Sequence, residues 1–388
     1  MENTKLNIIF IGSFTFPYGM GGTELVKRFV DYCTDHDCKV KVFTILKRLN
    51  KRDKNRYKGM YNNQVPYLNL GIITGFRIID ILQYPIILFY SLVLLLLWKE
   101  RNIKNILYVY DNINLFTALP VLFAKSIGYK VILEIVEDYA LNEDSTSSVR
   151  KINLRASIFL EKKIVLFTDS IIVVSKYLEN KFRVLCGEKI PVLLIPVSTD
   201  MNNNFAYRKE KRIFNFLYAG SFAKKDGLET LVKAFDIFNN KYGASKLNLI
   251  GDTNHHSYVQ ELLINDNIKY LGYVEDYFNI LFKSDVLCMT RTNSKFANAG
   301  FPHKIAEYLS TGIPVICSDV SDIKCYLENK KDAMIIVPDN VNELFEAMEF
   351  LYLNKERAYN IGNNGKSKAR TFFNSKRNGK LFLDFIRQ

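Results

Sequence analysis

The sequence predicts two α/β domains, each a doubly wound parallel sheet with helices on both faces. The chain has 388 residues, more than a single hydrophobic core usually serves, so two domains are expected. In each half, short apolar runs of strand length alternate with stretches whose apolar residues recur every three or four positions. A polar run at residues 198–212 separates the halves and is the strongest linker signal. We therefore place the domains at residues 1–197 and 214–375, with a linker at 198–213.

The composition predicts an anionic partner. The formal net charge is +13 and the isoelectric point is near 9.2, which fits nucleic acid, a phosphorylated substrate or an acidic membrane surface. Six cysteines are scattered without a CxxC pair, and the four histidines have no metal-ligand spacing. We therefore expect reduced thiols in a cytoplasmic protein and no structural metal. The first residues predict a strand, because their apolar run is too short for a signal peptide.

A glycine-rich loop follows the first predicted strand, at residues 6–11. Gly21 and Gly22 lead into a stretch with helical periodicity. A glycine loop before a helix allows a ligand to approach the backbone N–H groups at the helix N-terminus. The pattern alone is weak, because such loops are common after a first strand.

Acidic residues follow two later strands of the first half. The predicted strand at 105–110 ends at Asp111, and the one at 130–136 ends at Glu137 and Asp138. Open α/β sheets hold their ligands at the carboxyl edge, where these acids fall. One of them could take a proton from a hydroxyl as a general base. The alternative is that they are solvated loop carboxylates, and the sequence does not choose among the three.

A basic run and an apolar stretch lie between these features. Residues 47–58 carry seven basic side chains and one acid, which is either a solvated loop or a patch for anionic lipids. The uninterrupted apolar part of the stretch, residues 86–98, is shorter than the roughly 20 residues that span a bilayer. We weigh two interpretations. The helix is either partly buried and partly dipped into a membrane interface, with Trp98, Lys99 and Arg101 at the headgroups, or it is fully buried in the core.

The second half contains another glycine-framed loop after the predicted strand at 214–219. Gly220 and Gly227 bracket it, and an amphipathic helix follows. Lys224 and Lys225 lie within the loop and could reach a diphosphate. The alternative is that both are solvated surface lysines.

A loop, a helix and a strand follow at residues 298–319, after a predicted polar loop at 290–298. Gly300 and Pro302 mark the loop, and Gly312 ends the helix. The helix N-terminus suits a diphosphate, because its N–H groups have no partner within the helix. Glu307 lies about one and a half turns into the helix, where its carboxylate can accept hydrogen bonds from a ribose diol. Any αβ unit of a doubly wound sheet would show the same general pattern.

This segment resembles the donor-binding segment of GT-B glycosyltransferases, most closely the retaining group called family four. In that family a Glu, seven residues and a second Glu precede a small residue, then Gly-x-Pro-Val. Glu307 and residues 312–315 match the second part, whereas Ala299 stands where the first Glu is expected. The missing Glu contacts the donor sugar in the family. The spacing of Pro302 and Lys304 is similar to a Pro-x-Lys subgroup, which implies that Lys304 meets a phosphate as a point charge.

The resemblance extends over nearly the whole chain. The Gly-Gly-x-Glu pattern resembles the family's first loop. In the second loop the usual Arg and Lys are replaced by Ser221 and Asp226, so neighbouring lysines are expected to serve instead. Tyr273 falls where the family lines the nucleobase, and the last helix, at 376–388, is implied to pack toward the first domain. The implied donor-binding residues are Gly21, Gly22, Gly220, Lys224, Lys225, Tyr273, Gly300, Pro302, Lys304 and Glu307. The catalytic candidates remain Asp111, Glu137 and Asp138.

The resemblance implies the GT-B fold, with two Rossmann-like domains facing across a cleft. It implies transfer of a sugar, with retention of configuration, from a nucleotide-sugar donor to a glycan or lipid-linked glycan acceptor in surface polysaccharide synthesis. The nucleotide sugar is a substrate, and neither a cofactor nor a metal is expected. The expected location is the cytoplasm, with peripheral contact to the anionic inner face of the cell membrane, and no nucleic acid is expected. The alternatives are a GT-B sugar-nucleotide epimerase and a non-enzymatic basic module that binds membranes or polyanions.

Overall fold

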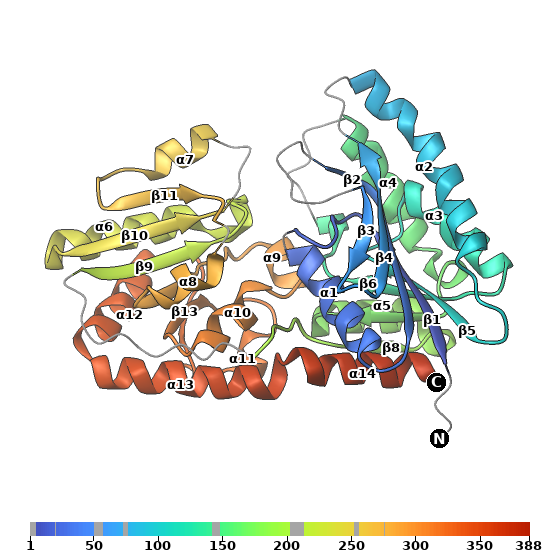
Figure 1. Ribbon diagram of the computed structural model, residues 1–388. Helices are drawn as coiled ribbons and strands as arrows, with labels where there is room; N and C mark the ends of the chain where they lie inside the picture. Colours follow the sequence, from blue (N-terminus) through green and yellow to red (C-terminus); the bar gives the residue numbers. More distant parts are fainter. Residues whose placement is uncertain are drawn as a thin grey trace. The chain divides into compact units, whose positions relative to one another are not determined.

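The computed structural model describes residues 5–19, 21–49, 57–72, 77–141, 148–201, 213–251, 256–274 and 276–388. The chain divides into two compact units (Figure 1). Unit 1 comprises Met1–Pro196 and Ser375–Gln388, and unit 2 comprises Val197–Asn374. The expected ends at residues 197 and 375 lie one residue beyond Pro196 and Asn374, and unit 2 includes the segment that was expected as a linker. Most of the expected linker, residues 202–212, lies outside the described residues.

Unit 1 contains an eight-stranded sheet in the order β3-β4-β2-β1-β5-β6-β7-β8. Neighbouring strands are parallel, except that β3 is antiparallel to β4. The strands are β1 (Leu6–Gly12), β2 (Lys39–Leu49), β3 (Lys58–Tyr61), β4 (Val65–Ile72), β5 (Lys104–Tyr110), β6 (Lys130–Ile135), β7 (Ser170–Val173) and β8 (Val192–Leu194).

The hairpin formed by β3 and β4 was not expected from the sequence. The basic run at 47–58 comes just before it in the sequence. The first residues of this run belong to β2, its last residue, Lys58, begins β3, and residues 50–56 lie outside the described part. Tyr67 of β4 is buried, and its ring meets Phe16 with the centroids 5.7 Å apart. The hairpin therefore extends the sheet and is held to unit 1 by tertiary contacts, which the sequence does not reveal.

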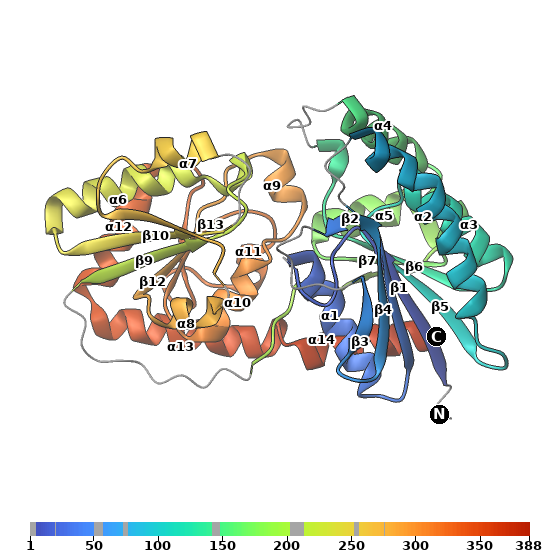
Figure 2. The same cartoon turned by 45° about the horizontal axis from the view of Figure 1, so that its top comes forward.

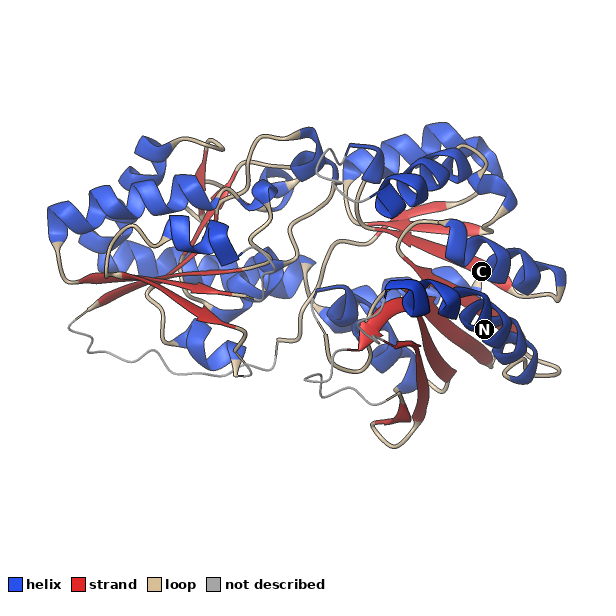
Figure 3. Ribbon diagram, turned by 90° about the horizontal axis from the view of Figure 1, so that it is seen from above, coloured by secondary structure: helices blue, strands red, loops and turns tan. Residues whose placement is uncertain are grey.

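Helices flank the sheet on both sides, and Figure 3 shows this arrangement in each unit. In unit 1, α2, α3 and α4 lie side by side (Figure 2), and α1 and α14 pack together. Phe10 and Tyr108 are paired on the neighbouring strands β1 and β5, so their side chains point to the same face of the sheet. They form a core with Phe29 of α1 and Phe382 of α14. The helices are α1 (Gly21–Thr34), α2 (Arg77–Leu97), α3 (Leu115–Ser126), α4 (Ser148–Glu161), α5 (Lys176–Cys186) and α14 (Ser375–Arg387), with short 3-10 turns η1 (Tyr139–Leu141), η2 (Ile164–Leu166) and η3 (Gly187–Lys189).

The apolar stretch at 78–98 forms α2 as far as Leu97, and the helix is partly buried, as the first interpretation expected, while its contact with a membrane stays a prediction. Ile87, Ser91 and Leu95 are buried, so the helix packs on the unit along one side. Phe89 and Leu97 are exposed on the other side, so full burial in the core was wrong. None of the described helices combines the length and the apolar character needed to cross a membrane.

Unit 2 contains a six-stranded parallel sheet in the order β11-β10-β9-β12-β13-β14. The strands are β9 (Phe214–Ala219), β10 (Ser245–Ile250), β11 (Ile268–Gly272), β12 (Val286–Met289), β13 (Val315–Ser318) and β14 (Met334–Ile336). The helices are α6 (Leu228–Tyr242), α7 (His256–Leu262), α8 (Tyr277–Phe282), α9 (Lys295–Ala299), α10 (Lys304–Thr311), α11 (Ile323–Tyr326), α12 (Val341–Leu353) and α13 (Lys355–Phe372), with a 3-10 turn η4 (Lys224–Asp226). The polar loop expected at 290–298 was wrong in its second part, because Ser294 caps α9 there by accepting a hydrogen bond from Ala297 N.

The chain passes between the units twice. The outgoing segment donates a hydrogen bond from Thr199 N to Phe373 O of the returning segment, over 2.8 Å. The last helix, expected at 376–388, is α14 and belongs to unit 1, whereas the preceding helix α13 belongs to unit 2. Phe382 of α14 stacks on Phe29 of α1 with the ring centroids 4.3 Å apart.

Candidate functional site

The strand order of unit 2 creates a ligand-binding edge between β9 and β12. From β9 the chain proceeds outward through β10 to β11, then returns to β12 on the other side of β9. The helices that follow β9 and β12 therefore leave the sheet in opposite directions, and open α/β sheets hold their ligands at the carboxyl ends of two such strands. Gly220 follows β9 and Arg291 lies two residues after β12, so both belong to this edge.

The loop from Gly220 to Gly227 has a fixed shape. Asp226 accepts hydrogen bonds from Ser221 Oγ (3.0 Å) and from Ala223 N (3.2 Å). Gly227 has φ +64°, and a Cβ there would lie 2.1 Å from Thr290 O, so only glycine fits. The Asp that replaces the family's cation at position 226 thus shapes the loop from within.

The two lysines of this loop lie in η4. Lys225 places Nζ over the ring of Phe296, 4.7 Å from its centroid, and its carbonyl accepts a hydrogen bond from Thr292 N (3.0 Å). Lys224 belongs to the same short turn. The turn is therefore tied to the segment that follows β12, which brings its cations to the same edge.

The start of α10 carries a compact charged cluster. Lys304 Nζ lies 3.3 Å from Glu307 Oε2 and 4.6 Å from the centroid of the Tyr277 ring. Tyr277 O–H donates a hydrogen bond to the same oxygen, Glu307 Oε2, over 3.0 Å. Within the described residues, both contacts of the Glu307 carboxylate go to Oε2. Oε1 therefore remains available to accept hydrogen bonds from a ligand.

The remaining predicted donor residues of unit 2 occupy different environments. Gly300 and Pro302 are buried in the connection between α9 and α10, so they set the path into the helix. Tyr273 follows β11 and is 70% exposed. Burial suits a positioning role, whereas an exposed ring is free to stack on a ligand.

Arg291 is a cation that the sequence analysis missed. Its Nη1 donates a long hydrogen bond to Ala297 O (3.5 Å), and its charge acts on the buried Tyr218 hydroxyl, which abuts Gly220. The guanidinium therefore lies beside the glycine loop that lacks the family's arginine. The feature that could have identified Arg291 is its position two residues after β12, the strand that neighbours β9 in the sheet.

Unit 1 has a corresponding edge between β1 and β5, where its strand order reverses. Gly21 and Gly22 are the first residues of α1 and do not form the loop expected before it. A Cβ on Gly22 would lie 2.8 Å from the hydroxyl of Tyr110, at the end of β5. The helix N-terminus therefore approaches this edge closely because glycine stands there.

Asp111 follows β5 and has an unusual environment. Its backbone has φ +71°, a left-handed conformation that is uncommon outside glycine and is found at functional sites. Tyr139 O–H donates a short hydrogen bond to Oδ2, and Oδ1 is buried without a hydrogen-bond partner among the described residues. Burial raises the pKa of Asp111 to about 7; the charge of Glu137 adds to the rise and the Tyr139 hydrogen bond opposes it. A carboxyl with this pKa exchanges protons readily near neutral pH.

The other two acids of this edge differ from Asp111. Asp138 is 3% exposed, pairs with Lys181 Nζ (2.9 Å) and accepts a hydrogen bond from Tyr177 O–H (3.1 Å). Lys181 also pairs with Glu161 (2.6 Å). Asp138 is thus held in a structural network, while Glu137 is half-buried and acts on Asp111 through its charge. The described residues contain no group of three or more His, Cys, Asp and Glu side chains placed to hold a metal ion.

Comparisons with known proteins bear on unit 2 and on the fold of the chain. Residues 200–368 match the family model described as glycosyl transferases group 1. Among solved structures, the chain is similar to sucrose-phosphate synthase from Thermosynechococcus elongatus, with 15% identity, 99% of each chain covered and a TM-score of 0.73. None of the curated protein sequences matches.

Two further solved structures have the same architecture. Anabaena Alr3699/HepE, in complex with UDP and glucose, is 15% identical over 98% of this chain and 99% of that chain, with a TM-score of 0.70. WaaG, a glycosyltransferase involved in lipopolysaccharide biosynthesis, is 12% identical over 96% of this chain and 99% of that chain, with a TM-score of 0.68. The predicted GT-B fold class is therefore confirmed.

Proposed function

We propose that this chain, whose residues 200–368 match the family model of the group 1 glycosyl transferases, moves a sugar from a nucleotide-sugar donor to a hydroxyl of a glycan or lipid-linked glycan. This match supports glycosyltransferase activity. The donor class, the acceptor class, the hexosyl group and the retention of anomeric configuration are our proposal. So are its role in cell-surface polysaccharide synthesis and its place at the anionic inner face of the membrane.

The observation that carries the donor assignment is the clustering of cations and an acid at the edge between β9 and β12. Arg291, Lys224 and Lys225 lie at or beside the glycine loop, and Lys304 begins α10. The N–H groups of that helix and these cations suit a diphosphate. Glu307 is placed to accept hydrogen bonds from the ribose diol through Oε1. The cations would stabilise the charge that grows on the departing nucleotide.

The proposed reaction needs one proton acceptor. The oxygen of the acceptor hydroxyl forms a bond to the anomeric carbon, and the bond from that carbon to the diphosphate oxygen breaks. The nucleoside diphosphate leaves with the electron pair, and the hydroxyl proton passes to the Asp111 carboxylate. No protein nucleophile is assigned.

A panel of nucleotides tests the donor site directly. With UDP, GDP, ADP and CMP at about 100 times the dissociation constant, one base should stabilise the fold by about 2.7 kcal/mol, or roughly 5–10 °C in melting temperature. The Glu307→Ala variant should lose most of this shift at the same concentration, because it lacks the ribose acceptor. Its melting temperature without nucleotide serves as the folding control. No shift from any nucleotide with the folded parent protein would contradict the proposal.

The Arg291→Gln variant tests how much the contact to the diphosphate contributes to affinity, apart from the contact to the nucleoside. We expect its affinity for the nucleoside diphosphate to fall by about 10- to 150-fold, the range for losing hydrogen bonds to a charged group. The free nucleoside should bind both proteins equally in calorimetry. Lys295→Gln is the matched control, because it removes an exposed cation four residues away. An unchanged diphosphate affinity in Arg291→Gln would remove this residue from the site.

A further inference from the structure

The outer helices of unit 1 expose a concentration of large apolar side chains, which we call the apolar face. On α3, the exposed leucines recur at positions i, i+4 and i+7, so they share one side of the helix. On α4, the two exposed residues are seven positions apart and also share a side. The helices α2, α3 and α4 lie next to one another (Figure 2), with α3 between the others. The face comprises Ile86 (57% exposed), Phe89 (64%), Tyr90 (54%), Leu96 (54%) and Leu97 (73%) of α2, Leu115 (46%), Leu119 (50%) and Leu122 (44%) of α3, and Ile152 (61%) and Phe159 (59%) of α4.

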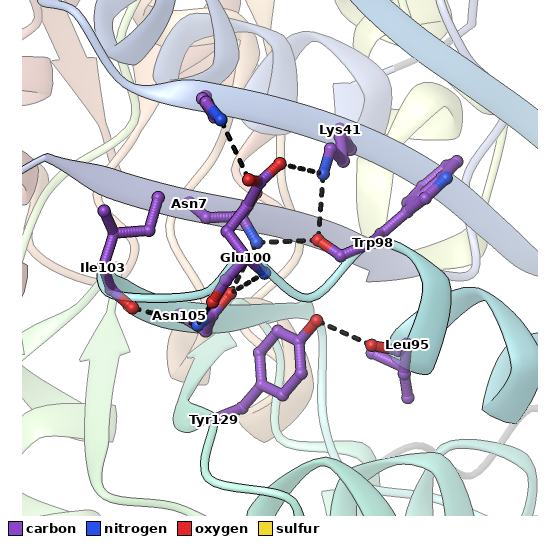
Figure 4. A network of polar contacts seen from close by, with 9 residues as sticks. Asn7, Lys41, Leu95, Trp98, Glu100, Ile103, Asn105 and Tyr129 are labelled. Atoms are coloured by element: carbon purple, nitrogen blue, oxygen red, sulfur yellow. Dashed lines mark hydrogen bonds and ion pairs between the residues drawn. The ribbon is translucent and has the colours of Figure 1, made fainter.

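The end of α2 is anchored, so this face is presented on a fixed support. Figure 4 shows that the carbonyl of Trp98 accepts hydrogen bonds from Asn7 Nδ2 and Lys41 Nζ, each over 2.9 Å. Tyr129 O–H donates to the carbonyl of Leu95 over 2.8 Å. These bonds satisfy carbonyls that a helix end leaves without partners. Because the anchoring is on the inner side, the exposed side chains of α2 remain directed away from the sheet.

The charges around the apolar face have one sign. Within the described residues 83–141 and 152–169, every charged side chain in the exposed class is a cation. The acids of the same segments are less exposed, and three of them are in ion pairs: Glu100 with Lys39 and Lys41, Asp169 with Lys125, and Glu161 with Lys181. Exposed apolar side chains bordered by cations match an anionic bilayer. The apolar side chains can insert at the acyl region, and the cations can contact the anionic headgroups. The exposed cations are Lys99, Arg101, Arg155, Lys162 and Lys163.

The apolar face begins close to the candidate proton acceptor. Leu115, the first residue of α3, follows Asp111 by four residues, which spans at most about 14 Å of chain. An acceptor hydroxyl at Asp111 would therefore lie near a surface suited to acyl chains. A water-soluble glycan would gain nothing from this proximity, whereas a lipid-linked acceptor could keep its lipid in the bilayer.

We propose that the apolar face docks on an anionic lipid bilayer and that the acceptor delivered to Asp111 is lipid-linked. The statement about the acceptor rests on the proposed function, whereas docking does not depend on it. Docking is peripheral, through the sides of α2, α3 and α4, and the cations add an electrostatic attraction that salt weakens.

Vesicle binding tests the docking surface. The parent protein should co-sediment with vesicles of phosphatidylglycerol and phosphatidylcholine, and less with phosphatidylcholine alone or in high salt. The double variant Phe89→Glu/Leu119→Glu should lower the partition coefficient at least tenfold. Val184→Glu, on α5, is the matched control, because Val184 is 86% exposed and lies outside the face. Equal binding of the double variant would overturn the proposal. So would light scattering that shows a parent dimer and a monomeric variant, since a second copy would then cover the face.

The acceptor class has its own readout. The protein is incubated with membrane lipid extract and with the nucleotide sugar of the base that the nucleotide panel selects, labelled in its sugar. The parent protein should transfer label to products that partition into the organic phase. The amount of this label should be at least tenfold lower with Phe89→Glu/Leu119→Glu. The nucleotide-induced thermal shift should be the same in both proteins, which shows that the variant is folded and its donor site intact. Label only in water-soluble products would overturn the lipid-linked acceptor. Vesicle binding by a parent that shows no nucleotide shift would instead reject the proposed function and leave docking standing.

Discussion

Replacing Asp111 with asparagine is expected to lower sugar transfer by about 100- to 10,000-fold, the usual contribution of a general base. Asparagine keeps the size of the side chain but does not take up the hydroxyl proton. Because the pKa of Asp111 is raised to about 7, the parent rate should fall about tenfold per pH unit below that value as the carboxylate becomes protonated. In Asp111→Asn the remaining rate should lose this dependence. The measurement is kcat/KM from pH 5.5 to 8.5, followed as release of nucleoside diphosphate.

A second variant distinguishes a catalytic role of Asp111 from a structural one. The hydrogen bond from Tyr139 lowers the pKa of Asp111, so Tyr139→Phe should move the acidic limb of the pH profile to higher pH. A purely structural loss would reduce the rate without moving the limb. Asp138→Asn is the companion control, because Asp138 is ion-paired with Lys181, and its loss should reduce stability without shifting the profile. An acidic limb that persists in Asp111→Asn would assign the proton to another group.

Replacing Glu134 with alanine is expected to destabilise unit 1 by about 3–5 kcal/mol, the cost of leaving one partner of a buried ion pair alone. Arg28 Nη2 lies 3.0 Å from Glu134 Oε1, with side-chain exposures of 2% and 0%. Tyr108 O–H also donates to Glu134, so two buried groups would lose their acceptor. Burial raises the pKa of Glu134 and lowers that of Arg28, which shows that both charges are held out of water at a cost.

The double variant Arg28→Met/Glu134→Leu is the control for this pair. It removes both charges and fills the space with apolar atoms, so it should be more stable than Glu134→Ala. The chain has a single tryptophan, Trp98, which lies in unit 1, so urea unfolding followed by its fluorescence reports on this unit. A loss below about 1 kcal/mol in Glu134→Ala would mean that water or a neighbour compensates Arg28.

The sequence predicted the fold correctly where apolar residues formed a continuous run or recurred at helical spacing. Buried parallel strands are continuous apolar runs, so β1, β5, β6 and β9 were found close to their observed bounds. Ser175 is of a residue type that favours helix N-caps, and its hydroxyl accepts a hydrogen bond from Leu178 N (3.2 Å) at the start of α5. The helix α9 was missed because it is only five residues long. The hairpin was missed because β3 is only four residues long and the apolar run of β4 follows the basic segment closely.

The candidate sites were less accessible to sequence analysis. Glycines and helix starts predicted where a ligand would approach, whereas the ion pairs and the pKa of each acid depend on partners far along the chain. Asp138 is neutralised by Lys181, 43 residues later in the numbering, and Asp111 is perturbed by Tyr139. Arg291 carries no motif of its own and is recognised only from the pairing of β12 with β9. These relations are fixed by the tertiary fold.

The place of α14 in unit 1 has a consequence for how the protein is made. Phe382, Leu383 and Ile386 belong to the same core as β1 and α1, although the whole of unit 2, Val197–Asn374, is synthesised between β8 and α14. When β8 has been synthesised, the core of unit 1 therefore still lacks the side chains of α14. Unit 2 can complete its fold during translation, whereas unit 1 is completed only after the residues of α14 have left the ribosome.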